Sequence, residues 1–251
     1  MRKKLIAGNW KMNFTGQEAS RYVERLIPSL AGSLQADVLL VPPFTALSVV
    51  SEKVRDAGLL LGAQDLYPEP KGAFTGEISA DMLKDCGCRF VLAGHSERRH
   101  LLGETDALVN KKLLAGLNAG LDVIFCLGET GEQREKGATK QVLESQLEKG
   151  LSGIRQSRIE GLVVAYEPVW AIGTGVTATT RQAQEAHCFI RTWVQGALGQ
   201  EVADGLSILY GGSVSPENAA GLLAERDIDG LLVGSASLDP EKFCAIISTA
   251  Q

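Results

Sequence analysis

One carboxylate stands at the end of an apolar run and is followed at once by proline. The stretch reads AYEPVWAIGTG over residues 165–175. Proline disfavours the helical conformation of the residue before it, so we expect Glu167 to stay extended and to prolong a strand. A carboxylate near apolar neighbours such as Ile172 becomes a stronger base once water is expelled, because its charge is less solvated. Glu167 is therefore a candidate general base, and the alternative is an ion pair with a nearby lysine or arginine.

A polar pair follows the first apolar run, at 4–9. Asn9 and Lys11 lie two residues apart, so in an extended backbone both side chains point to the same side. They would offer an amide and a cation to one site. A lone lysine at the end of a strand is more often simply solvated, so this pair gains weight only from its neighbours.

His95 begins the segment HSERRHLLGE (95–104), which we predict to be a short helix entered from a strand. The positive end of a helix dipole disfavours protonation of an imidazole placed there. A neutral His95 could donate an N–H to a substrate carbonyl. The alternative is a surface histidine, or one that is satisfied within the protein.

Two small-residue turns are candidates for binding an anion. Gly211-Gly212-Ser213 and Gly234-Ser235 each follow an apolar run and precede a helix-like segment. Small residues let backbone N–H groups approach a phosphate closely, and a following helix N-terminus adds its dipole. The stretch GTGVTA (173–178) fits the dinucleotide pattern G-x-G-x-x-A. However, a Trp-containing loop separates it from the preceding strand, so we do not expect NAD binding.

Eight short apolar runs carry these candidate residues. They are 4–9, 37–41, 59–63, 89–93, 121–126, 161–166, 205–210 and 229–234. The runs are nearly continuous in Val, Ile, Leu and Ala, which is typical of parallel strands covered on both faces. Helix-like segments lie between them, such as 17–31, 104–119, 138–152, 179–198, 215–225 and 239–248.

A strand–helix unit repeated about eight times over residues 1–251 predicts a single-domain (β/α)8 barrel with a parallel eight-stranded core. In such barrels the chemistry lies where strands end and the next loops begin. The candidate residues all fall at such positions, so we expect them to meet at one rim of the barrel.

Composition narrows the partners. A formal net charge of -5 argues against nucleic acid or an anionic membrane as the main partner. No apolar run approaches a membrane-spanning length, and the first residues do not resemble a signal peptide, so we expect a cytoplasmic protein. Five scattered cysteines predict free thiols, with neither a disulfide framework nor a metal site.

Several stretches closely resemble the triosephosphate isomerase family, and they occur in order along the full length. They are NWKMN (9–13), AGHSERR (93–99), CLGET (126–130), AYEPVWAIGTG (165–175), YGGSV (210–214) and DGLLVGSASL (229–238). The resemblance implies a TIM barrel of glycolysis and gluconeogenesis that needs no cofactor. It would interconvert dihydroxyacetone phosphate and D-glyceraldehyde 3-phosphate through an enediol(ate).

The resemblance also implies a role for each site residue. Glu167 would be the base, and neutral His95 would be the electrophile that polarises the carbonyl. Lys11 would bind substrate and stabilise negative charge, with Asn9 beside it and the acid Glu97 nearby. Phosphate would lie on backbone N–H groups of Gly173, Ser213, Gly234 and Ser235. The lid would comprise Pro168, Val169, Trp170, Ala171, Ile172, Gly173, Thr174, Gly175 and Val176, held shut by Tyr210 and Ser213.

The family is usually a homodimer, and its third strand–helix loop, here 65–79 with Thr75 near the tip, reaches towards the partner's site. This chain departs from the family at two positions. Ser235 stands where a second glycine is common. It keeps the N–H but needs an allowed φ, and its hydroxyl would either contact the phosphate or crowd it. Val176 replaces the lysine that is usual at the end of the lid. We expect this change to alter the kinetics of lid opening; lid closure in this family is itself a standard example of such motion.

Two other functions are compatible with these residues. A Schiff-base lyase would use Lys11 as nucleophile, which requires a desolvated and deprotonated amine. Asn9, Glu97 and an anionic substrate would instead keep that lysine charged. A non-catalytic barrel would bind a sugar phosphate tightly without exchanging a proton at the substrate carbon.

Overall fold

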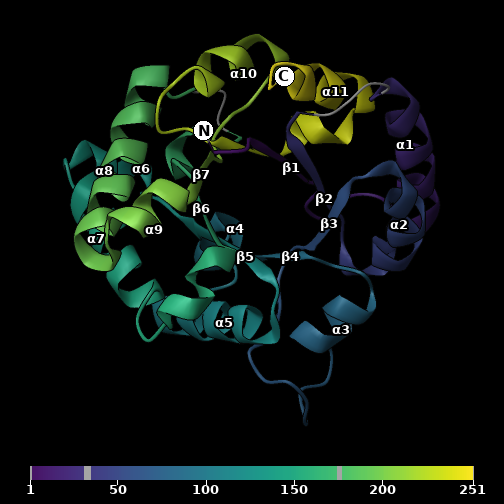
Figure 1. Ribbon diagram of the computed structural model, residues 1–251, viewed down its shortest axis with the longest axis horizontal. Helices are drawn as coiled ribbons and strands as arrows, with labels where there is room; N and C mark the ends of the chain where they lie inside the picture. Colours follow the sequence, from purple (N-terminus) through teal and green to yellow (C-terminus); the bar gives the residue numbers. More distant parts are fainter. Residues whose placement is uncertain (1, 31–34, 174–176, 251) are drawn as a thin grey trace.

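The computed structural model describes residues 2–30, 35–173 and 177–250. Its strands form one closed, all-parallel barrel in the order β1 to β8, with helices around the outside (Figure 1). The strands are β1 (Leu5–Asn9), β2 (Asp37–Val41), β3 (Leu60–Ala63), β4 (Phe90–Ala93), β5 (Asp122–Leu127), β6 (Leu162–Tyr166), β7 (Ser207–Tyr210) and β8 (Gly230–Val233). Their ends lie within two residues of the apolar runs, so the predicted (β/α)8 barrel is confirmed.

Helices connect the strands and cover the outer surface of the barrel. They are α1 (Gly16–Ser29), α2 (Leu47–Val54), α3 (Ala80–Asp85), α4 (Ser96–His100), α5 (Asp106–Ala119), α6 (Gly131–Glu135), α7 (Thr139–Gly150), α8 (Thr180–Leu198), α9 (Gln200–Gly205), α10 (Pro216–Leu223) and α11 (Pro240–Ser248). The six long segments predicted from the sequence are confirmed to within two residues at each end. The helix expected at 95–104 is shorter, and only α4 is helical there.

Each strand contributes to two apolar layers. Side chains that point into the barrel form one cluster, made up of Leu5, Ala7, Leu39, Val41, Phe90, Leu92, Ile124, Cys126, Val163, Ala165, Leu209 and Leu232. The alternate residues, such as Ile6, Val91 and Val164, pack outward against the helices in a second and larger cluster. Both layers are buried, which explains why the runs read as continuous rather than alternating.

The same alternation orients the candidate site residues. Val163 and Ala165 point into the barrel, and Glu167 continues their side just beyond the end of β6. Asn9 ends β1 on the side of Leu5 and Ala7. The period-two geometry of a strand therefore delivers both polar groups to the mouth of the barrel.

Local sequence signals set the helix that follows the lid. Thr179 and Gln182 form a reciprocal capping box at the start of α8: the Gln182 N–H donates to Thr179 Oγ1 at 3.2 Å, and the Thr179 N–H donates to Gln182 Oε1 at 2.9 Å. Two backbone donors of the first turn are satisfied in this way. The chain therefore enters α8 at a fixed residue directly after the lid.

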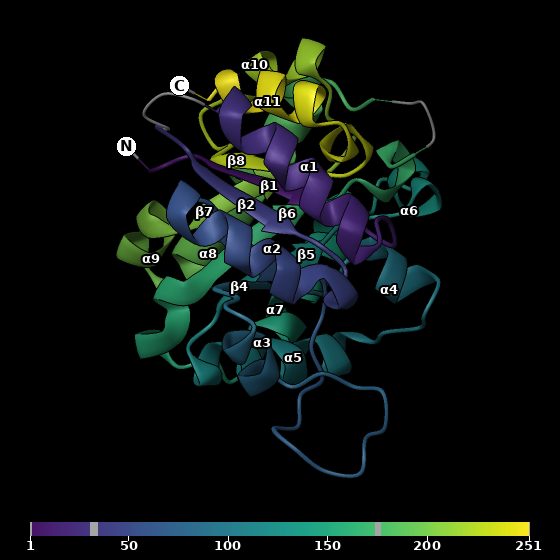
Figure 2. The same ribbon diagram turned by 90° about the vertical axis from the view of Figure 1, so that its right-hand side faces the viewer.

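The connection between β3 and α3 projects away from the barrel (Figure 2). Its base is closed by a hydrogen bond from the Tyr67 N–H to the Ile78 carbonyl at 2.8 Å. Residues 69–76 between them are exposed. In the part of the chain that the structure describes, no helix is both long and apolar enough to cross a membrane.

Candidate active site

A cavity of about 240 Å³ opens at the carboxyl ends of the strands. Its wall contains Asn9, Trp10, Lys11, Asn13, His95, Glu167, Ile172, Gly173, Gly211, Gly212, Ser213, Val214, Leu232, Gly234, Ser235 and Leu238. The structure thus brings together Asn9, Lys11, His95 and Glu167 with the expected phosphate-binding residues. A cavity of this size, below the range for drug-sized ligands, suits a small molecule. The chemical roles of these residues stay predictions.

Glu167 is almost fully buried, with 1% of its surface exposed. Its Oε2 accepts a hydrogen bond from the Ser96 N–H at 2.7 Å, and its Oε1 lies 3.0 Å from His95 Nε2. No residue near Glu167 in sequence makes these contacts, and the prediction did not include Ser96. Two donors therefore hold the carboxylate at the cavity wall in this structure.

His95 is the residue immediately before α4, as the sequence indicates. Its Nδ1 accepts a hydrogen bond from the Glu97 N–H at 3.3 Å. An Nδ1 that accepts a hydrogen bond suits the tautomer with its proton on Nε2, the nitrogen that faces Glu167 Oε1. The neutral state of His95 stays a prediction.

Lys11 reaches the cavity by a different route from the one predicted. The strand ends at Asn9, and Lys11 has a left-handed φ of 52° instead of an extended backbone. Its N–H donates to Asn9 Oδ1 at 3.0 Å, and its carbonyl accepts from Gln64 Nε2 at 2.7 Å. The expectation of an extended backbone at Lys11 is therefore wrong: two side-chain hydrogen bonds hold an uncommon turn conformation.

The Lys11 ammonium is paired with a carboxylate outside the cavity wall. Its Nζ lies 2.5 Å from Glu97 Oε1. The two side chains are 27% and 41% exposed, so water still reaches the pair. A neighbouring carboxylate stabilises an ammonium rather than a free amine, so Lys11 presents a positive charge at the cavity.

The expected phosphate-binding residues come from three loops that line the cavity. Ser213 follows β7, Gly234 and Ser235 follow β8, and Gly173 comes from the lid. Ser235 begins a short 3-10 helix and is not among the described non-glycine residues with positive φ, which are Lys11 and Phe14. The serine therefore fits this loop without left-handed strain.

The described part of the predicted lid covers Pro168 to Gly173, with a 3-10 turn at Val169–Ala171. Of these lid residues, Ile172 and Gly173 line the cavity. Thr174, Gly175 and Val176 lie outside the described residues.

A buried carboxylate that the sequence reasoning did not single out anchors the lid. Glu129, which is fully buried, accepts from Trp170 Nε1 at 2.9 Å, from Tyr166 Oη at 3.0 Å and from Arg134 Nη1 at 3.0 Å. The Arg134 guanidinium also lies 4.4 Å from the centre of the Trp170 ring. The position of Glu129 directly after an apolar run was visible in the sequence, but its three partners come from separate elements.

Gly128 allows a close approach behind Glu167. A Cβ atom at this position would lie 1.9 Å from the carbonyl oxygen of Glu167 and 2.6 Å from its carbonyl carbon. No larger residue fits unless the backbone that carries Glu167 moves.

The nearby Cys126 is fully buried. Burial raises the pKa of its thiol well above the ordinary value, and the Glu167 charge is a smaller cause of the same shift.

Outside residues 1, 31–34, 174–176 and 251, no group of three or more His, Cys, Asp or Glu side chains is arranged to hold a metal ion.

Tyr210, which was expected to hold the lid shut, is not part of the cavity wall. It is fully buried beneath the Gly211-Gly212 turn, and burial raises the pKa of its hydroxyl to about 12.

Comparison with known proteins extends these observations. The family model described as Triosephosphate isomerase matches residues 4–250. Proteins named triosephosphate isomerase from Carboxydothermus hydrogenoformans and Moorella thermoacetica are 53% identical over 247 residues and 52% identical over 251 residues. The first match covers 98% of each chain, and the second covers 100% of each. A protein of the same name from Geotalea uraniireducens is 50% identical, with 98% of each chain covered.

Proposed function

The chain belongs to the triosephosphate isomerase family, and we propose that it works with Glu167 as base and neutral His95 as electrophile. It is an aldose–ketose isomerase that interconverts dihydroxyacetone phosphate and D-glyceraldehyde 3-phosphate. The observation that carries the residue roles is the contact between Glu167 and His95. A buried carboxylate and an imidazole lie 3.0 Å apart in the cavity that the proposed phosphate loops also line.

Substrate binding is proposed to begin at the phosphate end. Backbone N–H groups of Gly173, Ser213, Gly234 and Ser235 would bind the phosphate, and Lys11 would balance part of its charge. The Lys11 side chain lies against this loop: a Cβ atom placed on Gly234 would be 3.4 Å from Lys11 Cε. A phosphate fixed there would orient the two substrate carbons that do not carry the phosphate toward Glu167 and His95.

Proton transfer would then use the Glu167 carboxylate and the His95 imidazole. Glu167 would leave the Ser96 N–H and take a proton from the carbon next to the carbonyl. The bonding electrons would move to the carbonyl oxygen, where the His95 Nε2–H and the Lys11 charge would stabilise them. Glu167 would return the proton to the neighbouring carbon, while the hydroxyl of the first carbon loses its proton to the former carbonyl oxygen and becomes the new carbonyl.

The test is isomerisation coupled to a dehydrogenase in the presence of a metal chelator. We expect turnover to persist with the chelator, and we expect product formed in D2O to carry deuterium at the carbon that receives the proton. The variant Glu167→Gln keeps the size of the side chain but cannot accept the proton, so it should lose both signals. Deuterium incorporation by Glu167→Gln at the wild-type rate would contradict the assignment of the base.

The Schiff-base alternative has less support. It needs a neutral amine at Lys11, whereas the pair with Glu97 stabilises the ammonium. Borohydride treatment in the presence of substrate should therefore leave the mass of the protein unchanged. A reduced substrate adduct on Lys11 would favour the lyase instead.

We also propose a homodimer that uses loop 65–79, with Thr75 near its tip. Support comes from large apolar side chains that are exposed among the described residues, namely Met12, Phe44, Phe74, Met82, Leu101 and Leu102. All six lie in the connections that follow β1, β2, β3 and β4, which are adjacent in the barrel. An apolar surface concentrated over one side of a barrel favours an interface with another protein surface, here a second copy.

Sedimentation tests the dimer. We expect the unsubstituted chain to sediment as a dimer and Leu101→Asp to shift it toward monomer, because Leu101 is 78% exposed in the single chain. Gln195→Asp places the same charge on an exposed site of α8 and should leave the dimer intact. A monomer at all protein concentrations for the unsubstituted chain would contradict the proposal.

A cytoplasmic location is also proposed, since all five cysteines are free, which suits a reducing compartment.

A further inference from the structure

The turn that follows β8 carries two of the residues proposed to bind phosphate. Gly234 and Ser235 line the cavity, and the chain changes there from a strand to the 3-10 turn Ser235–Leu238. Gly234 has a φ of -87° and a ψ of -111°, which belong neither to a strand nor to a helix. The ψ of Gly234 sets the direction of the next peptide group and so of the Ser235 N–H. Whatever fixes this peptide group therefore fixes a proposed phosphate donor.

Ser237 is buried on the outer side of the barrel wall, between β1 and α11. A Cβ atom on Gly8, in β1, would lie 3.0 Å from Ser237 Cβ and 2.9 Å from Phe243 Cζ, which belongs to α11. Gly8 faces outward, because its neighbour Ala7 points into the barrel. Ser237 is fully buried there and is not part of the cavity wall. It therefore acts on the phosphate turn from behind.

Two donors of Ser237 hold the same backbone carbonyl. Its hydroxyl donates to the Gly234 carbonyl at 2.7 Å, and its N–H donates to the same oxygen at 2.8 Å. The peptide group between Gly234 and Ser235 is trans, so its carbonyl and its N–H point in opposite directions. With the carbonyl held on the outer side, the Ser235 N–H is turned toward the cavity.

A tyrosine from the beginning of the chain fixes Ser237 in turn. The hydroxyl of Tyr22, on α1, donates to the Ser237 carbonyl at 2.6 Å, and this contact is buried. Burial raises the pKa of the Tyr22 hydroxyl above its ordinary value, so it stays protonated and able to donate. The Tyr22 ring also packs against the edge of Trp10, with the ring centres 4.7 Å apart. Hydrogen bonds therefore connect α1 through Ser237 to Gly234.

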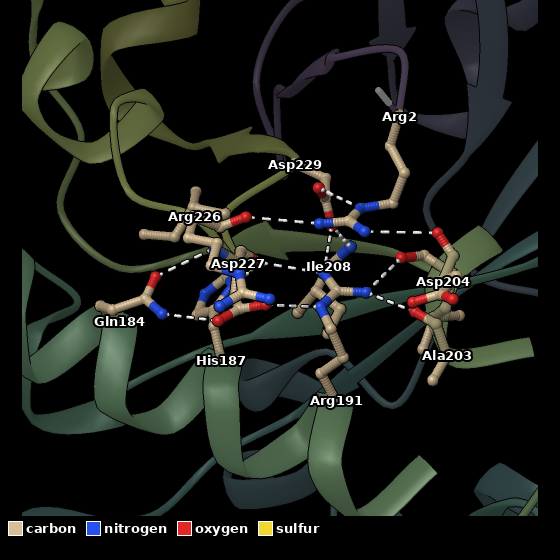
Figure 3. A network of polar contacts seen from close by, with 12 residues as sticks. Arg2, Gln184, His187, Arg191, Ala203, Asp204, Ile208, Arg226, Asp227 and Asp229 are labelled. Atoms are coloured by element: carbon tan, nitrogen blue, oxygen red, sulfur yellow. Dashed lines mark hydrogen bonds and ion pairs between the residues drawn. The ribbon is translucent and has the colours of Figure 1, made fainter. Parts of the chain in front are cut away.

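The opposite end of β8 is fixed by a separate polar network (Figure 3). Asp229, directly before β8, accepts from Arg2 and from Arg191, each at 2.6 Å. Arg191 also donates to the carboxylate of Asp227 at 2.7 Å, and the Asp227 carbonyl lies 3.2 Å from Nδ1 of the buried His187. The strand itself pairs with β1 and β7. It is therefore held at its start and along its length, and the turn beyond it depends on the bonds described above.

We propose that Ser237 is a positioning residue of the phosphate site and that Tyr22 supports it. The bonds to the Gly234 carbonyl present the Ser235 N–H to the cavity before substrate arrives. A preorganised donor binds more tightly, because no free energy is spent on ordering it. The inference rests on the proposed phosphate site, and inorganic phosphate tests it without turnover.

Inorganic phosphate is the probe, and the 15N–1H NMR resonance of the Ser235 amide is the measurement. We expect this resonance to move as phosphate is added to the unsubstituted chain. Ser237→Ala should raise the Kd for phosphate about 2- to 10-fold, as expected for the loss of one neutral hydrogen bond. A Ser235 amide that phosphate does not move would overturn the proposal.

Ser248→Ala is the matched control. Serine hydroxyls often bond to a carbonyl of the preceding turn for purely local reasons. Ser248, exposed on α11, makes such a bond to the Cys244 carbonyl at 2.9 Å. Its loss should leave the Kd for phosphate unchanged, and equal Kd values for Ser237→Ala and Ser248→Ala would overturn the proposal.

Tyr22→Phe covers the case in which Ser237→Ala does not fold. It keeps the ring and loses the bond to the Ser237 carbonyl, so the Kd should again rise about 2- to 10-fold. An unchanged Kd would overturn the role of Tyr22 and, where Ser237→Ala does not fold, the whole proposal.

Steady-state kinetics separate positioning from a loss of stability. In the coupled assay both variants should raise KM by the same factor with little change in kcat, because a contact that binds substrate and transition state equally is weakened. A fall in kcat with unchanged KM, as expected from a smaller folded fraction, would overturn the proposal. Absence of isomerisation in the unsubstituted chain would instead refute the proposed function, and the phosphate titration would still decide the role of Ser237.

Discussion

Replacement of Gln64 should weaken catalysis although Gln64 does not line the cavity. Its Nε2 donates to the Lys11 carbonyl at 2.7 Å and to the Val41 carbonyl at 3.1 Å. These bonds help to hold Lys11 at a φ of 52°, a conformation that costs of order 1–3 kcal/mol in a non-glycine residue. In Gln64→Leu both bonds are lost, and nothing on that side opposes relaxation of the Lys11 backbone.

The size of the effect follows from these two bonds. A neutral hydrogen bond contributes about 0.5–1.5 kcal/mol, so the loss is about 1–3 kcal/mol. This free energy is lost from the conformation in which Lys11 faces the phosphate loop, which is the conformation proposed to bind substrate. Since each 1.36 kcal/mol is a factor of ten in rate, kcat/KM should fall by about 5- to 150-fold. Much of the effect should appear in KM, because Lys11 is proposed to bind the phosphate-bearing substrate.

Steady-state kinetics in the coupled assay measure this change. Gln195→Leu is the matched control, because it makes the same substitution at an exposed α8 site where the glutamine side chain donates to Gln200 Oε1. The control should stay within about twofold of the unsubstituted enzyme, as surface changes usually do. If Gln64→Leu is as active as Gln195→Leu, then Gln64 does not position Lys11 and the reasoning fails.

Three further predictions concern the base, its backbone and a buried histidine. Glu167→Asp withdraws the carboxylate by one methylene and should lower kcat by about 100-fold, as a misplacement of about 1 Å can, with little change in KM; near-normal kcat would refute the role of Glu167. Gly128→Ala should lower kcat and the melting temperature, since its Cβ would lie 1.9 Å from the Glu167 carbonyl oxygen. The control Gly196→Ala lies in open space on α8 and should raise the free energy of unfolding by about 0.5–1 kcal/mol. Equal shifts in melting temperature for the two variants would contradict this reasoning. His187 has a folded-state pKa of about 4 against 6.5 for the model group, so the unfolded chain binds more protons between these values and stability falls as pH drops through that window. Urea unfolding should show a loss of roughly 2 kcal/mol from pH 7 to pH 5 that is absent in His187→Phe, and an equal loss in both proteins would count against a neutral buried histidine.

Short-range patterns in the sequence predicted the barrel because each pattern reports a local physical constraint. Continuous apolar runs reported strands buried on both faces, and the structure contains the two apolar layers that this requires. The proline after Glu167 indicated an extended residue, and the alternation of β6 brings Glu167 to the inner side. The same reasoning failed at Lys11, because its conformation depends on Gln64, which lies more than fifty residues away.

Other parts of the site were equally beyond local reasoning. Glu167 rests on the Ser96 N–H, and Glu129 collects donors from Tyr166, Arg134 and Trp170. Residue types alone gave no reason to choose these partners, because a carboxylate accepts from many donors and the distances become defined only once the barrel closes.

By itself, the sequence determined which residues alternate, the bounds of the strands and of the six long helices to within two residues, and which polar groups stand at the carboxyl ends of strands. Those properties depend on neighbours within a few residues, and hydrophobic periodicity and capping report them directly. Only the tertiary structure decided the left-handed turn at Lys11 and the buried contacts of Glu129 and His187. Each of these depends on hydrogen bonds in a closed barrel, where groups far apart in the chain are brought together and water is excluded.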